Sequence, residues 1–69
     1  MFDPAEGNLR EQYAAAQKNR ILQAAARVFE ANGYERATTK KIAAEAGLSE
    51  GALFHHFKTK RDLLLGVLE

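Results

Sequence analysis

Two adjacent histidines, His55 and His56, are the side chains in this sequence best suited to acid–base or metal chemistry. Neighbouring residues of a helix point about 100° apart, so two histidines in succession do not easily bind one metal ion. No cysteine or carboxylate follows them at a ligand spacing. We therefore do not interpret the two histidines as a metal site.

No combination of residues in the sequence is typical of an enzyme. Ser49 is the only serine, and no histidine–aspartate pair accompanies it. The glycines form no phosphate-binding loop, and the absence of cysteine excludes disulfides and thiolate metal sites. We therefore expect a protein that is not an enzyme and that needs no metal or cofactor.

The charges are distributed unevenly along the chain. The net charge is only +1, but residues 36–61 sum to +4 and residues 1–17 sum to −2. A basic segment inside a near-neutral chain is compatible with a surface that faces DNA. It is equally compatible with an ordinary solvated surface, and charge alone does not decide between the two.

The length of 69 residues allows one small domain. Chains of this size bury about 60% of their unfolded surface, so the core must be modest. Residues 1–8 contain no long apolar run, so we expect neither a signal peptide nor a membrane span, and we expect a cytoplasmic protein. Residues 1–12 are predicted to form a flexible polar arm, and residues 13–69 the folded domain.

The first predicted helix begins near Glu11 and ends near Asn32. Apolar residues recur in it at spacings of three and four, which places them on one face: Ile21, Leu22, Ala25, Val28 and Phe29. Gly33 follows the last of these turns, where a left-handed backbone conformation needs no Cβ. Tyr34 can then pack back over the end of the helix.

Three shorter helices are predicted after it, and the fold class is therefore all-α. The second begins at Thr38 or Thr39 and stops at Gly47. The third is capped by Ser49 and runs to about Phe57. The fourth covers residues 60–69 and is capped by Thr59, with an aspartate three residues later in the capping-box position.

The second and third helices have the spacing of a helix-turn-helix over residues 39–57. Ala43 is the fifth residue of this unit, where two steeply crossing helices leave room only for a small side chain. Gly47 is the ninth, where a three-residue turn requires a positive φ. Leu48 and Leu53 can hold the angle between the helices from below. Any short helical hairpin can use similar residues, so this spacing alone is moderate support.

The outward face of the third helix strengthens the interpretation, because its residues contribute little to a core: Glu50, Gly51, Ala52, His55 and His56. Small residues at the helix start would let the backbone approach the edges of bases closely. An alanine methyl group can also contact a thymine methyl group. The pattern therefore suits insertion of the third helix into the major groove.

About two thirds of the chain resembles the N-terminal domain of the tetracycline-repressor (TetR) family of bacterial regulators. The stretches that carry the resemblance are ILQAA (21–25), Phe29 with Gly33 and Tyr34, TTKKIA (38–43), AGLS (46–49), GALFHHF (51–57) and KTKRDL (58–63). The resemblance implies a dimeric repressor whose second and third helices read a palindromic operator in the major groove.

The resemblance also implies roles for single residues. Thr39 and Lys40 match positions that hold phosphates or a base at the start of the second helix. His56 and Lys60 match phosphate contacts, and Lys60 begins the fourth helix, where free N–H groups also favour anions. Phe54 stands where the family usually has tyrosine, and it lacks the hydroxyl that would reach a phosphate. The predicted DNA-binding residues are Thr39, Lys40, Glu50, Gly51, Ala52, Phe54, His55, His56 and Lys60.

The resemblance further implies a C-terminal domain that binds a small-molecule effector and forms the homodimer, and we expect this domain to be absent from the chain. Five of the last seven residues are apolar and lie on more than one side of the fourth helix. A small protein-interaction module that uses this helix remains an alternative. An activator or an architectural DNA-binding protein remains another.

Overall fold

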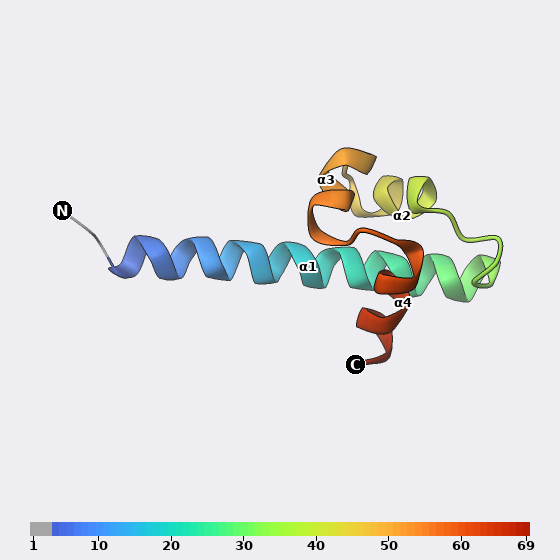
Figure 1. The fold of residues 1–69 in the computed structure, drawn as a ribbon, viewed down its shortest axis with the longest axis horizontal. Coiled ribbons are helices and arrows are strands. Elements are labelled where there is room, and N and C mark those ends of the chain that lie inside the picture. The colour runs from blue at the N-terminus through green and yellow to red at the C-terminus, as the bar shows by residue number, and fades with distance from the viewer. Residues whose placement is uncertain (1–3) are drawn as a thin grey trace.

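The computed structural model describes the backbone of residues 4–69 and the side chains of residues 9–69. This part of the chain consists of four helices and contains no strand: α1 (Pro4–Asn32), α2 (Thr39–Ala46), α3 (Glu50–His56) and α4 (Lys60–Leu68). In Figure 1, α1 is the long central rod, with α2 and α3 on one side of its C-terminal half and α4 crossing that same half. The predicted all-α fold is confirmed.

The first helix starts earlier than the sequence predicted. It was expected to begin near Glu11, after a polar arm, but residues 4–12 are already helical. Residues 9–18 consist almost entirely of strong helix formers, including Leu9 and three successive alanines, which extend the helix beyond the part that packs. Leu9 and Tyr13 are exposed there. Residues 1–3 of the expected arm lie outside the described residues.

The core lies where α1 meets α2 and α4. Four large side chains in it are fully buried: Ile21, Ile42, Leu53 and Leu63. Alanines of α1 and α2 fill the space between them and let the helix axes approach closely. Phe57 and Leu48 are partly buried against this core, as expected from their positions at the two ends of α3.

Each short helix begins with a side-chain cap. The Thr38 hydroxyl accepts from the Lys41 N–H, the Ser49 hydroxyl from the Ala52 N–H at 3.1 Å, and the Thr59 hydroxyl from the Asp62 N–H at 3.0 Å. Thr38 rather than Thr39 is therefore the cap of α2. This leaves the Thr39 hydroxyl available for another partner.

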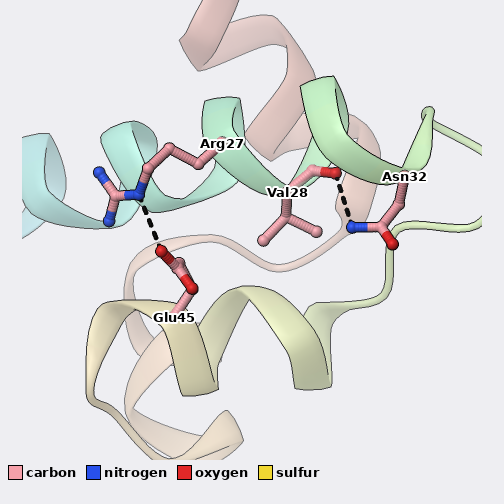
Figure 2. Close-up of polar contacts among 4 residues, drawn as sticks. All are labelled: Arg27, Val28, Asn32 and Glu45. Atoms are coloured by element: carbon pink, nitrogen blue, oxygen red, sulfur yellow. Dashed lines mark hydrogen bonds and ion pairs between the residues drawn. The ribbon is translucent and has the colours of Figure 1, made fainter.

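Polar contacts add to the apolar packing between α1 and α2. The Arg27 Nε donates to Glu45 Oε1 at 2.9 Å across the two helices, and the Asn32 amide donates to the Val28 carbonyl at 3.0 Å (Figure 2). The Arg27 and Glu45 side chains are about half exposed, so this ion pair contributes less than about 1 kcal/mol. Its main effect is to favour one rotational setting of α2 against α1.

The helices of the described residues are too short or too polar to span a bilayer.

Candidate DNA-binding site

Helix α3 packs against the rest of the domain through one side only. Leu53 is its one fully buried residue, and the other side chains of the helix are exposed or half-buried. Helix α2 is the element that supports α3 most closely, while α1 and α4 pack mainly on other surfaces. The geometry therefore presents one long side of α3 to solvent and makes its direction depend on α2.

The turn between α2 and α3 has the positive φ at Gly47 that the sequence predicted. Gly47 has φ +74°, and the Leu48 N–H donates to the Ala43 carbonyl at 2.8 Å, closing the end of α2. Ala43 itself is 1% exposed and lies in the core between α1 and α2. The prediction that this position requires a small residue is consistent with that burial. Together these residues set the angle at which α3 leaves α2.

The fold does not require a glycine at position 51, at the start of α3. A Cβ added at Gly51 would meet only the Ser49 hydroxyl, at 3.9 Å, and Gly51 does not have a positive φ. Ala52 is half-buried and Gly51 is exposed. Folding would thus tolerate a larger residue at position 51. The absence of a side chain there is best explained by a binding partner that approaches this side of α3.

A hydrogen bond joins the first residues of α2 and α3. The Thr39 hydroxyl donates to Glu50 Oε2 at 3.2 Å. The other carboxylate oxygen of Glu50 accepts no hydrogen bond from a described residue, and the Glu50 side chain is exposed. Two residues that were predicted separately for the site are therefore in direct contact, which the sequence alone did not indicate.

The Lys60 ammonium has internal partners. It donates to the carbonyl oxygens of Tyr34 at 2.7 Å, Ala37 at 3.1 Å and Glu35 at 3.4 Å. It also lies 4.3 Å from the centroid of the Tyr34 ring. These contacts tie the start of α4 to the loop that leads into α2. A contact between this ammonium and a phosphate would require one of the three hydrogen bonds to be replaced.

The two histidines lie at the C-terminal end of α3. His55 is exposed and His56 is half-buried, and their rings make an edge-on contact with centroids 5.3 Å apart. Partial burial lowers the pKa of His56 below its ordinary value, and the nearby charges of His55 and Lys18 lower it further. His56 is therefore mainly neutral at pH 7 in the DNA-free protein. Lys18, from α1, was not a predicted site residue, and 38 positions of sequence separate it from His56.

The remaining predicted residues lie on the surface. Lys40 is exposed in the first turn of α2, and Phe54 is 37% exposed on α3. None of the nine predicted residues is buried, and all come from α2, α3 or the first residue of α4. The described residues include no group of three or more histidines or carboxylates that could hold a metal ion.

One hollow lies away from this surface, between α1 and α2. Its volume is about 200 Å³, and its lining residues are Arg27, Val28, Ala31, Asn32 and Glu45. Pockets for small ligands typically measure about 300–1,000 Å³ and enclose most of the ligand. This hollow is smaller and open, so it is a poor candidate for an effector site.

Four helices in this order, a tight glycine turn between α2 and α3, and an outward-facing α3 define the helix-turn-helix class of DNA-binding domains. The sequence model of the tetR family of bacterial regulatory proteins matches residues 21–67. The chain therefore belongs to the tetR family and carries its N-terminal DNA-binding domain.

Curated relatives share this region of sequence. The HTH-type transcriptional repressor Rv1474c of Mycobacterium tuberculosis is 39% identical over 57 residues, which are 83% of this chain and 30% of that protein. The nucleoid occlusion factor SlmA of Shewanella amazonensis is 43% identical over 78% of this chain and 27% of its own length. The HTH-type transcriptional repressor AcnR of Corynebacterium diphtheriae is 42% identical over 72% of this chain and 26% of its own length.

The matched region thus spans less than a third of each of these relatives. No solved structure matches the chain significantly.

Proposed function

We propose that this chain reads one half of a DNA operator by placing α3 in the major groove. The observation that carries the proposal is Gly51 at the start of α3, an exposed position without a side chain where the fold itself would accept a larger residue. In this arrangement the α3 backbone comes close to base edges, and the Ala52 methyl group can contact thymine. Phe54 and His55 belong to the same helix and are exposed on its outward side.

Phosphate contacts would come from the two helix starts beside α3. The main-chain N–H groups of Thr39 and Lys40 lie in the first turn of α2, next to the exposed Lys40 ammonium. The N–H group of Lys60 lies in the first turn of α4 and has no partner among the described residues. His56 would supply a further contact once it is protonated. These groups fix the position of α3 and carry no base preference.

The whole protein would be a ligand-responsive repressor that acts as a homodimer in the bacterial cytoplasm. Rv1474c and AcnR are named as transcriptional repressors, which supports this role. A dimer would place two copies of α3 one helical turn apart on a palindromic operator. Its effector would bind in a further domain, since the matched region spans less than a third of each of these repressors.

A second role is supported by SlmA, which is named a nucleoid occlusion factor and is as similar in sequence as the repressors are. The surface of α2 and α3 would serve either role, because both require DNA binding. Identifying the bound sites in the genome would separate them, since sites upstream of genes indicate a regulator and sites dispersed over the chromosome indicate the other role.

Selection of bound sequences from a random DNA pool tests the proposal. We expect an enriched motif for the wild-type chain. Gly51→Ala is the matched control for Gly51→Leu, because both variants keep the α3 backbone unstrained. Gly51→Leu should lose specific binding with its helix content by circular dichroism unchanged, and Gly51→Ala should lose much less. Normal binding of the selected motif by Gly51→Leu would show that α3 does not read the bases.

A further inference from the structure

The hydrogen bond between Thr39 and Glu50 spans the two helix starts of the proposed DNA surface. Glu50 is the first residue of α3 and Thr39 the first residue of α2. The 3.2 Å bond from the Thr39 hydroxyl occupies one carboxylate oxygen of the exposed Glu50 side chain, and the other oxygen has no hydrogen-bond partner among the described residues. The carboxylate is thus oriented by the protein, and one of its acceptor oxygens is available for a ligand.

An ionised carboxylate can only accept hydrogen bonds, and this limits what it can contact on DNA. Phosphate oxygens repel it. In the major groove the only donors are the 4-amino group of cytosine and the 6-amino group of adenine. The adenine donor lies between two acceptors, its own N7 and O4 of the paired thymine. The cytosine donor has an acceptor on one side only, O6 of the paired guanine. The carboxylate is therefore repelled least at cytosine.

We propose that Glu50, oriented by Thr39, selects cytosine at one position of each half-site. The inference rests on the proposed function, since it names the base that this surface reads. The Thr39 hydroxyl contributes by holding the carboxylate in one direction before DNA arrives, which reduces the conformational freedom lost on binding. While it donates to Glu50, this hydroxyl cannot also donate to a phosphate, so Thr39 contacts the DNA backbone through its main chain alone.

Binding-site selection with four variants of the chain tests this assignment. Glu50→Gln keeps the size of the side chain and adds donors, so it should shift the preference at one position from cytosine to adenine, which glutamine contacts through N6 and N7. Discrimination at that position should change by about 10- to 100-fold. Thr39→Val removes only the hydroxyl and should reduce the preference for cytosine several-fold. In Glu50→Gln, adding Thr39→Val should have a smaller effect than in the wild type.

The control variant is Glu30→Gln, which removes one exposed carboxylate from α1, outside the helix-turn-helix. It should select the wild-type motif. A second measurement uses a duplex in which the selected cytosine is replaced by an analogue without the 4-amino group. The wild type should bind the analogue duplex more weakly than the cytosine duplex, and Glu50→Gln should show a smaller difference between the two duplexes.

The inference is overturned if Glu50→Gln selects the same motif as the wild type, or if the position that changes holds a base other than cytosine in the wild-type motif. An unchanged preference in Thr39→Val would remove Thr39 from the mechanism. These results differ from a failure of the proposed function, in which the wild-type chain itself would select no motif. Circular dichroism of each variant shows whether it has folded.

Discussion

Replacing Lys60 by methionine tests how the start of α4 is attached to the loop before α2. In the structure the Lys60 ammonium donates to the carbonyl oxygens of Tyr34 and Ala37 at 2.7 and 3.1 Å and lies over the Tyr34 ring. Methionine keeps an unbranched apolar side chain and removes the charge and its hydrogen bonds. We expect Lys60→Met to unfold at a lower temperature than the wild type.

The size of the effect follows from these contacts. A hydrogen bond to a charged group contributes about 1.5–3 kcal/mol when it is well buried. Lys60 is half-buried, so solvent screening reduces each of the two short bonds to about 1 kcal/mol. The contact with the ring adds roughly 0.5 kcal/mol. A total of about 2.5 kcal/mol should lower the Tm of a domain of this size by roughly 10–20 °C.

Thermal unfolding followed by circular dichroism measures this effect, with Lys58→Met as the control. Lys58 is exposed and makes no hydrogen bond or ion pair with a described residue, so its loss should change stability by less than about 0.5 kcal/mol. The dependence of DNA affinity on salt adds a second measurement. Lys40→Met should reduce the slope of log K against log salt by about 0.9, and Lys60→Met should leave it unchanged.

Equal melting temperatures for Lys60→Met and Lys58→Met would refute the positioning role of the ammonium. A salt slope reduced in Lys60→Met as much as in Lys40→Met would instead show that the Lys60 ammonium reaches a phosphate, as the sequence predicted.

Two further predictions concern the core and His56. Ala43→Leu should destabilise the chain by about 1–3 kcal/mol, because the larger side chain separates α2 from α1. Since this also redirects α3, specific DNA binding should weaken more than nonspecific binding. Equal melting temperatures and affinities for the variant and the wild type would contradict this prediction. DNA affinity should rise as pH falls below about 6.5, because a phosphate raises the pKa of His56 in the complex, whereas His56→Gln should lack that rise. The folded state lowers the pKa of His56, so its contribution to stability is complete above about pH 6.5 and is lost as pH falls through the folded value. Affinity must therefore be measured well below the Tm.

Local signals in the sequence were enough to predict most of the fold. Side-chain caps at Ser49 and Thr59 and the positive φ of Gly33 and Gly47 depend on residues close together in sequence, and the structure has all of them. The start of α1 was missed, because helix propensity acts there without an apolar stripe to mark it.

The sequence predicted nine DNA-binding residues, none of which is buried in the structure, but it did not predict the contacts that they make. The family resemblance identified which positions of α2 and α3 face outward. The bond from Thr39 to Glu50 and the bonds from Lys60 to Tyr34 and Ala37 join residues 11 to 26 positions apart. Such contacts depend on how the helices pack, and no periodic pattern in the sequence encodes them.

A nuclear magnetic resonance titration of the labelled chain with its selected duplex tests most directly whether α3 reads DNA. The amide signals of α3 and of the first turns of α2 and α4 should shift, and a scrambled duplex of equal length should shift those of residues 50–52 much less. Signal changes confined to the exposed apolar residues Leu65 and Leu68 of α4, or equal changes with both duplexes, would contradict the assignment of α3 as the reading helix.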